Sequence, residues 1–460
     1  MEETRVSARR GAAFTRDWTK GNIFHNLLSL SWPMIMSNSL NMLGPTVDMI
    51  WVGKLGAAAI AGVGVAGMIV MLVNSMLMGL FMGLRAMVAR SIGAGDEKSA
   101  VHVAKQAIVI STAFSIFTAV IGIFFAEPIM RLLGVEADVI TQGAPYLRIN
   151  FVGMVAMSFR MMTDTTMQAS GDSMNPMKIA VVFRFFHIAL CPFLVFGWWF
   201  FPQMGVSGAA ITNVISQSLG TTIGLWILLT GRSRLRLVFS NFHLDFDVIW
   251  RLVKVGTPAS VMGMERTLSG VIMMWFMVPF GTLAVAGHTL CQRIEMMLFV
   301  PVMGLGMGAG VLAGQNLGAH QPERAERGGW LAMGLAEGFM AVCSLAILLW
   351  AESIIRIFNA NPELVALAST FLRIAVVGYL MMGFAGVLMS CISSAGDTLP
   401  PMLVSLLTGW LVQIPLAYFL PRATGLGVYG VRWAIVAAMV LGAVIYTIYF
   451  RLGKWKQKKV

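Results

Sequence analysis

The chain contains little charge and few cysteines. Charged residues make up 12% of its 460 residues, against roughly 25% in an ordinary soluble domain, and this scarcity excludes a typical soluble fold. The four cysteines lie in apolar stretches without the spacing of secreted or zinc-binding proteins, so we expect neither disulfides nor a structural metal. The basic N-terminus also lacks the apolar core and cleavage site of a signal peptide.

Motifs of catalysis and nucleotide binding are missing as well. The sequence has no His-Glu-x-x-His, His-x-x-x-His or Gly-x-Ser-x-Gly pattern, and no Gly-x-x-x-x-Gly-Lys-Ser/Thr loop. We therefore expect no enzyme activity, no cofactor and no direct use of ATP. A membrane-embedded enzyme stays as the less favoured alternative.

Long apolar stretches dominate the chain instead. Hydrophobic residues make up 57% of the sequence and the mean hydropathy is +0.78. A helix needs about 20 apolar residues to cross a bilayer, and backbone groups in lipid must be satisfied within the segment. These rules predict an all-α membrane protein with about twelve transmembrane helices, near residues 26–48, 58–84, 101–125, 138–160, 176–198, 206–229, 248–279, 284–312, 330–350, 364–390, 401–420 and 428–450.

The second half of the chain repeats the first at one constant offset, which is the separation between Pro33 and Pro258. At the same offset, Leu147-Arg148-Ile149 and Gly171-Asp172 recur as Leu372-Arg373-Ile374 and Gly396-Asp397. Six spans per half is an even number, so both halves share one orientation. They are predicted to form parallel repeats about a pseudo-two-fold axis along the membrane normal, an arrangement typical of transporters.

Basic residues set the predicted orientation. The net charge is +12, but Lys and Arg gather at both termini and in alternate loops, so they indicate a cytoplasmic side rather than a nucleic-acid surface. Both termini are predicted to be cytoplasmic. The predicted domains are an N-terminal cytoplasmic tail (1–22), a six-helix lobe (23–230), a cytoplasmic linker (231–247), a second six-helix lobe (248–451) and a basic cytoplasmic tail (452–460).

Several motifs resemble one transporter family. These are the first-span run Val47-Asp48-Met49-Ile50-Trp51-Val52-Gly53-Lys54-Leu55-Gly56 with Pro33 before it, Gly314-Gln315-Asn316-Leu317-Gly318-Ala319, Gly171-Asp172 and Gly396-Asp397-Thr398. In this order, and with the duplication, the chain resembles the multidrug and toxin extrusion (MATE) family from about Asn26 to Tyr449. The resemblance implies export of cationic or amphipathic compounds in exchange for inward Na⁺ or H⁺, through a V-shaped central cavity between two six-helix lobes.

Charge inside a bilayer is costly, so each case is a functional candidate. Asp48 matches the aspartate of the family's first helix, and the resemblance implies a residue that binds the coupling ion; an interfacial helix cap is the alternative. Pro33 removes a helix hydrogen bond, and the resemblance implies a hinge, although a fixed kink fits equally well.

The fifth span departs from the family's Asn-x-x-x-Asp-Pro pattern. His187 stands where the asparagine is expected, and Cys191 where the aspartate is expected. Hard cations such as Na⁺ want oxygen ligands, whereas histidine changes its charge near neutral pH. We therefore expect H⁺ coupling through Asp48 and His187, with a structural histidine as the alternative. Thr212 approximates a hydroxyl ligand of the family or packs between helices.

The second half holds further embedded charges. Glu265, Arg266, Arg293 and Glu295 sum to zero, so they are read either as one ion-pair network, which His288 could join, or as cavity groups. Asn38 and Asn41 either line the cavity or bond between helices.

The sequence therefore predicts a secondary antiporter that exports cationic or amphipathic small molecules in exchange for H⁺ or Na⁺. We expect a monomer in the bacterial inner membrane that binds no nucleic acid, and no metal beyond a transported Na⁺. A lipid-linked precursor flippase of the same superfamily remains an alternative, with Arg160 and Arg184 as its candidate basic residues.

Overall fold

The computed structural model describes residues 16–239 and 242–458, and within them it is helical without a strand. Residues 1–15 of the predicted N-terminal tail and 459–460 of the C-terminal tail lie outside the described residues. The main helices are α2 (Ile23–Val52), α3 (Ala57–Gly93), α4 (Glu97–Leu132), α5 (Ala137–Val152), α6 (Met154–Ser170), α7 (Met174–Phe196), α8 (Gly205–Thr230), α9 (Phe246–Met277), α10 (Thr282–Gly318), α11 (Pro322–Phe358), α12 (Pro362–Tyr379), α13 (Met382–Ser394), α14 (Leu399–Leu406), α15 (Ile414–Ala423) and α16 (Val428–Leu452). Short segments η1 (Gly53–Leu55) and η2 (Val278–Phe280) follow α2 and α9, and a π-helical segment, η3 (Leu407–Gln413), joins α14 to α15.

Nine helical segments among the described residues are long and apolar enough to cross a membrane. The three predicted spans outside this set correspond to α2, to the pair α5 and α6, and to α8. The first and last are long, but polar residues lie along them, among them Asn41, Asp48, Thr212 and Gln217. These two long helices therefore carry polar groups into the protein among their apolar residues.

Two predicted spans are wrong as single helices. The span at 138–160 divides into α5 and α6, and the span at 364–390 divides into α12 and α13. A backbone N–H freed by such a break needs a partner in an apolar environment. At the start of α13, Glu337 of α11 supplies one, because its Oε1 accepts from the backbone N of Phe384 at 3.1 Å.

The helix bounds repeat at the same offset as the sequence. Shifting α3 by the separation of Pro33 and Pro258 gives 282–318, the bounds of α10, and shifting η1 in the same way gives 278–280, the bounds of η2. The break between α5 and α6 recurs as the break between α12 and α13. The predicted duplication is confirmed at the level of the backbone.

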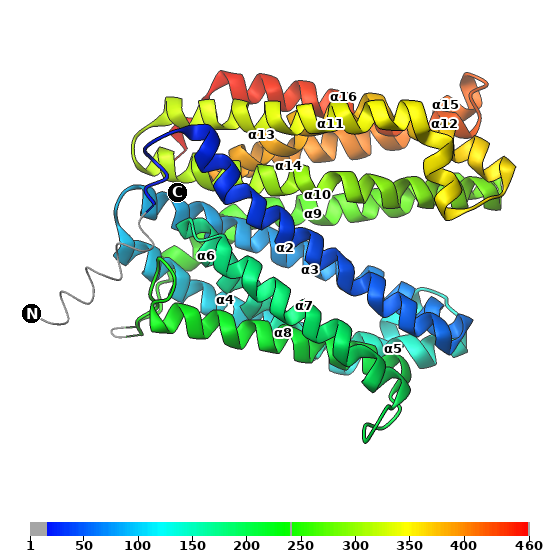
Figure 1. The fold of residues 1–460 in the computed structure, drawn as a ribbon, viewed down its shortest axis with the longest axis horizontal. Helices are drawn as coiled ribbons and strands as arrows, with labels where there is room; N and C mark the ends of the chain where they lie inside the picture. The colour runs from blue at the N-terminus through cyan, green and yellow to red at the C-terminus, as the bar shows by residue number, and fades with distance from the viewer. Residues whose placement is uncertain (1–15, 240–241, 459–460) are drawn as a thin grey trace, which may run out of the picture. The chain divides into compact units, whose positions relative to one another are not determined.

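The chain divides into two compact units, and the same helix neighbours occur in each. One unit contains residues 36–254 and the other contains residues 19–35 and 255–458. In the first, α3 packs against α4, α5 and α6, and α7 lies beside α8; in the second, α10 packs against α11, α12 and α13, and α15 lies beside α16 (Figure 1). The predicted domain boundaries remain predictions.

Large apolar side chains on the outside of the helices fit a lipid environment. On α4, Phe117 and Phe124 are 61% and 67% exposed, whereas small residues of the same helix, such as Ala104 and Ala107, are buried. In water such a surface would be an aggregation hazard, but in a bilayer it contacts hydrocarbon. On α4 the structure therefore buries mostly small and polar residues and turns large aromatic ones outward.

The N-terminus of α4, which lies outside the apolar stretch, is capped by the residue that precedes the helix. Asp96 accepts hydrogen bonds from the backbone N of Ser99 at 2.9 Å and from its hydroxyl at 2.6 Å, as an N-cap residue does. The hydroxyl bond of Ser99 is the largest cause that lowers the pKa of Asp96. The carboxylate therefore stays charged where the helix dipole favours negative charge.

Glycine permits the closest approach between α7 and α8. A Cβ placed on Gly208 would lie 2.5 Å from the backbone O of Leu194, and backbone cannot move aside as a flexible side chain can. Gly64 of α3, in contrast, has open space at the Cβ position.

We expect Gly208→Ala to destabilise the protein by about 1–3 kcal/mol, because the methyl group forces α7 and α8 apart. The matched variant Gly64→Ala meets no atom and should be neutral or slightly stabilising. Thermal unfolding of the purified variants in detergent compares the two. Equal melting temperatures for both variants would contradict the close packing described here.

Candidate functional site

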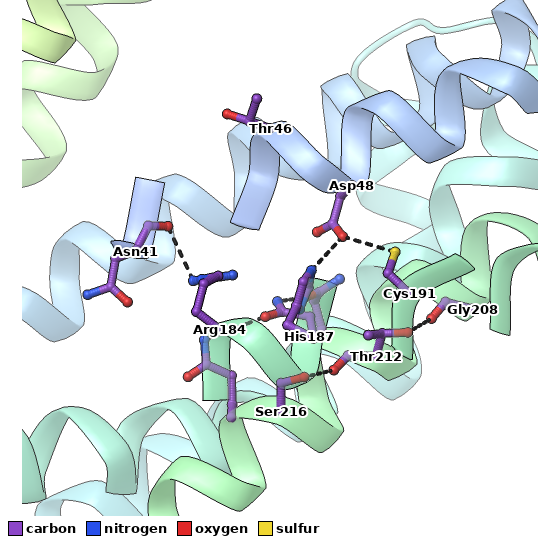
Figure 2. A network of polar contacts seen from close by, with 12 residues as sticks. Asn41, Thr46, Asp48, Arg184, His187, Cys191, Gly208, Thr212 and Ser216 are labelled. Atoms are coloured by element: carbon purple, nitrogen blue, oxygen red, sulfur yellow. Dashed lines mark hydrogen bonds and ion pairs between the residues drawn. The ribbon is translucent and has the colours of Figure 1, made fainter. Parts of the chain in front are cut away.

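Asp48, His187 and Cys191 meet in the first unit, and we call these three residues the Asp48 cluster. The Asp48 carboxylate is 5% exposed, and its Oδ1 lies 2.9 Å from His187 Nε2 and 3.5 Å from Cys191 Sγ. His187 and Cys191 are themselves buried. Figure 2 shows both side chains of α7 pointing at the carboxylate of α2. The sequence prediction that Asp48 and His187 act together is thus matched by direct contact, while their role remains a prediction.

Helix periodicity places these groups. His187 and Cys191 are four residues apart on α7, so they share one face. Pro192 follows Cys191 inside the helix and cannot donate the usual backbone hydrogen bond. On α2, Asn41 and Asp48 are seven residues apart, which is about two helical turns, and they face the same part of α7.

Arg184 completes the contact between α2 and α7. Its Nη2 donates to the backbone O of Asn41 at 3.3 Å (Figure 2). A Cβ on Gly44 would lie 1.8 Å from Arg184 Nη1, so only glycine leaves room for the guanidinium in this position. The residues Asn41, Gly44 and Asp48 form one face that receives Arg184, His187 and Cys191.

The ligand atoms of the Asp48 cluster are chemically mixed. They are one carboxylate oxygen, one imidazole nitrogen and one thiol sulfur, and they lie within 4.8 Å of one another. Na⁺ prefers a shell of oxygen atoms, which this set does not provide. His187 Nδ1 is buried and has no hydrogen-bond partner in the described part of the chain, so the imidazole keeps a free position for a proton or a water molecule.

Thr212 lies on α8 on the far side of this cluster from α2 (Figure 2). Its hydroxyl is fully buried and donates to the backbone O of Gly208 at 2.7 Å, and its own backbone O accepts from Ser216. Both hydrogen bonds lie within α8, as those of hydroxyl side chains in helices commonly do, and the two roles considered for Thr212 stay predictions. No contact between Thr212 and Asp48 is present among the described residues.

A second buried group, the arginine cluster, consists of Arg160, Asp164 and Gln217 together with Arg184. Arg160 Nη1 donates to Asp164 Oδ2 at 2.5 Å, and Arg160 Nε donates to Gln217 Oε1. The guanidinium groups of Arg160 and Arg184 lie 4.8 Å and 5.1 Å from the Phe183 ring, within the range of cation–π attraction.

Two polar atoms of the arginine cluster lack hydrogen-bond partners among the described residues. Arg184 Nε and Asp164 Oδ1 are buried without a hydrogen-bond partner in the described residues. The sequence analysis considered Arg160 and Arg184 only as basic residues of a flippase, and it missed Asp164 and Gln217. The rule that a charge within a span is a candidate did not reach Asp164, because the predicted span ends at residue 160 whereas α6 continues to Ser170.

The reading of these four charges as one ion-pair network is wrong, and the alternative reading as cavity groups stays a prediction. Glu265 of α9 accepts from the Ser405 hydroxyl, and Arg266 Nη2 lies 2.9 Å from Met389 Sδ. Arg293 is exposed and forms no ion pair with a carboxylate of the described chain. Glu295 pairs with Arg432, a residue that the sequence analysis did not consider.

His288 does join one of these groups. Its Nδ1 lies 3.3 Å from Arg432 Nη1. An arginine only donates, so this nitrogen must accept and the imidazole proton sits on Nε2. Tyr379 adds a hydrogen bond to Glu295 Oε1 at 3.1 Å. The result is a neutral group of a base, an acid and a permanent cation, in which His288 Nε2 and Arg432 Nε have no hydrogen-bond partner among the described residues.

The remaining candidates lie along α2. Pro33 is buried, and the helix continues through it. Asn41 contributes its backbone carbonyl to Arg184, and Asn38 is half-buried. The hinge role of Pro33 and the cavity role of the two asparagines stay predictions.

Two copies of one helical bundle, outwardly apolar and holding a few buried polar groups, define a multi-pass membrane transporter rather than an enzyme. The family model for MatE matches residues 33–193 and 258–419, two segments whose starts are separated by the offset of the repeat. The chain belongs to the MatE family.

The chain is similar to known proteins over nearly its full length. The chain is 26% identical over 451 residues to the probable multidrug resistance protein YoeA of Bacillus subtilis (strain 168), with 97% of each chain covered. It is 23% identical over 414 residues to the FAD transporter of Shewanella oneidensis, covering 89% of this chain and 90% of that protein. A crystal structure of MATE in the bent conformation has the same fold, with a TM-score of 0.89, 22% identity and coverage of 95% of this chain and 96% of that one.

We expect Asp164→Ala to destabilise the protein by about 3–5 kcal/mol, because it leaves the buried Arg160 charge without its carboxylate. The matched control is Glu127→Ala, which removes the exposed partner of Arg131 at 2.6 Å and should cost less than about 1 kcal/mol. Thermal unfolding in detergent distinguishes the two variants. A control that unfolds as early as Asp164→Ala would contradict the buried role of this pair.

Proposed function

We propose that this chain is a proton-coupled secondary antiporter that exports amphipathic organic cations from the cytoplasm. The observation that carries the proposal is the buried Asp48 carboxylate, held by His187 Nε2 at 2.9 Å and by the Cys191 thiol at 3.5 Å. Its partners are neutral donors, so the charge of the cluster changes when one proton is gained or lost.

Proton binding and cation binding exclude each other at such a site. With Asp48 ionised, His187 Nε2–H and the thiol donate to the carboxylate, and a negative charge attracts an organic cation. A proton delivered from outside neutralises the carboxylate and releases that attraction. Export of one cation is thereby linked to entry of a proton, because each ligand binds the state that the other opposes.

H⁺ is favoured over Na⁺ by the atoms of the cluster. Only Asp48 offers oxygen ligands, and nitrogen and sulfur occupy the other two positions. His187 Nδ1, on the same ring, has no partner among the described residues. Thr212 supports this face of α7 by packing rather than as an ion ligand.

Pro33 is proposed as the hinge of α2. It lies two residues before the point where the division between the two units cuts this helix, between Ile35 and Met36. A helix bends most easily where proline removes a hydrogen bond. In the proposed cycle, loading of Asp48 biases this bend, and with it the side to which the site opens. The protein is proposed to act as a monomer in the bacterial inner membrane with both termini in the cytoplasm.

Purified protein in liposomes tests the coupling. Uptake of ethidium is measured with a pH gradient alone or a Na⁺ gradient alone, since one pH unit supplies about 1.4 kcal/mol per proton. We expect the pH gradient to drive uptake and the Na⁺ gradient to have no effect. Asp48→Asn should lower the driven rate at least about tenfold, the factor that corresponds to about 1.4 kcal/mol, and His187→Asn should shift its pH dependence.

The matched control is His320→Asn. His320 is exposed, and its φ of 58° is a left-handed conformation that asparagine tolerates. This variant should transport like the parent. Proton-driven uptake that survives Asp48→Asn, or a pH profile that His187→Asn leaves unchanged, would contradict the proposed coupling site.

Export of organic anions is a second candidate function, favoured by the arginine cluster. Arg184 carries a buried Nε without a partner in the described residues, and it lies on the same face of α7 as His187. Guanidinium groups bind phosphate and carboxylate well. A relative is an FAD transporter, and a lipid-linked precursor would also be anionic.

A substrate comparison separates the two functions. The proposed cation exporter should carry ethidium and not FAD in the same liposomes, and Arg184→Gln should retain most of the ethidium transport. FAD transport that is lost in Arg184→Gln would instead establish the anion exporter. The matched variant Arg131→Gln, which changes an exposed arginine, should alter neither substrate.

A further inference from the structure

A cluster of metal-binding residue types lies outside the Asp48 cluster, where α4 meets the linker that precedes α9. We call His102, His243 and Asp245 the linker cluster. His102 Nε2 lies 2.9 Å from Asp245 Oδ2, and the rings of His102 and His243 are 4.9 Å apart. One ligand atom from each residue lies within 4.8 Å of the others. All three belong to the first unit.

The positions of these side chains are fixed by their surroundings. Gln106, four residues after His102 on α4, is fully buried; its Nε2 donates to the backbone O of His243 at 2.8 Å, and its Oε1 accepts from the backbone N of Asp245 at 3.3 Å. One buried amide therefore holds the linker on both sides of Leu244. This is the supporting contact by which protein metal sites orient their ligands.

Asp245 is oriented by a separate contact. Its Oδ1 accepts from the backbone N of Asp247 and of Val248, each at 3.1 Å, and so caps the start of α9. Its Oδ2 is left to face His102.

We propose that the linker cluster binds a divalent transition-metal ion of the zinc class. Two imidazole nitrogens and one carboxylate oxygen are the ligands that such ions share, whereas Ca²⁺ and Mg²⁺ require oxygen alone. Tetrahedral zinc holds its ligand atoms about 3.3 Å apart, so small side-chain rotations close the site. When the ion takes His102 Nε2, the neutral imidazole carries its proton at Nδ1 instead, so the ring changes tautomer without a net loss of a proton.

The position of the cluster suits an ion taken from solution. The His243 side chain is exposed, and those of His102 and Asp245 are 27% and 28% exposed, so water can reach the site and fill its fourth position. A bound ion would tie α4 directly to the linker between the two repeats. The site is independent of the proposed transport function.

Isothermal titration of the tag-free protein in detergent with ZnCl₂, repeated with CoCl₂ and visible absorption, tests this proposal. We expect one site that His243→Ala or His102→Ala weakens at least about 100-fold, beyond the roughly 10–100-fold expected for the supporting variant Gln106→Ala. Asp245→Asn is the most selective variant, because asparagine can still cap α9 but binds metal weakly. Melting temperatures confirm that each variant folds.

Two controls distinguish the linker cluster from other binding. His320→Ala removes an exposed histidine elsewhere, and His187→Asn removes a ligand from the Asp48 cluster; the linker site should survive both. The proposal is overturned by a parent protein without a Zn²⁺ site, or by binding that persists in His243→Ala and disappears in either control.

Discussion

A carboxylate inside an apolar helical bundle must be given a partner, and the choice of partner decides what the group can do. Asp164 and Glu295 are paired with Arg160 and Arg432, which cannot give up their protons, so these pairs are fixed. Asp48 is bound instead by a histidine and a thiol. Glu265 also has a neutral partner, the Ser405 hydroxyl, but serine cannot take up a proton. The Asp48 carboxylate is therefore held by neutral partners and not by a fixed cation, which is the basis of the coupling site proposed above.

The duplication supplies the scaffold, and side chains then give the two halves different chemistry. At the offset that relates Pro33 to Pro258, Gly44 and Arg184 correspond to Ser269 and Gly409. In the first half, glycine on the first helix receives arginine from α7; in the second, Gly409 leaves room for Glu265 of α9, whose Oε1 would be 2.1 Å from a Cβ there. Gly409 lies in the π-helical segment η3, although α7 is regular throughout. The roles of the two helices are therefore exchanged between the halves. In the first half the glycine lies on α2 and the charged residue on α7; in the second half the charged residue lies on α9 and the glycine on η3.

Hydropathy predicted the approximate positions of the spans, because a helix that crosses lipid must be long and apolar. The constant offset predicted the repeat. The adjacency of Asp48 and His187 followed from a family resemblance. The reading of the four second-half charges as one network failed because sequence does not give the rotation of a helix. Arg293 and Glu295 are two residues apart, about 200° around α10, so one is exposed and the other reaches Arg432. The breaks before α6 and α13 escaped prediction because hydropathy does not change there.

The boundaries between the two compact units fall within α2 and within its repeat mate α9. Contacts group residues 19–35 with the second repeat and residues up to 254 with the first, so both helices are divided near their beginnings. The cuts lie close to Pro33 and Pro258, where a backbone hydrogen bond is missing. Asp48 is fifteen residues beyond Pro33 on the same helix. In the proposed cycle, a change in charge at Asp48 reaches the other unit along the continuous backbone of α2, with Pro33 as the proposed hinge.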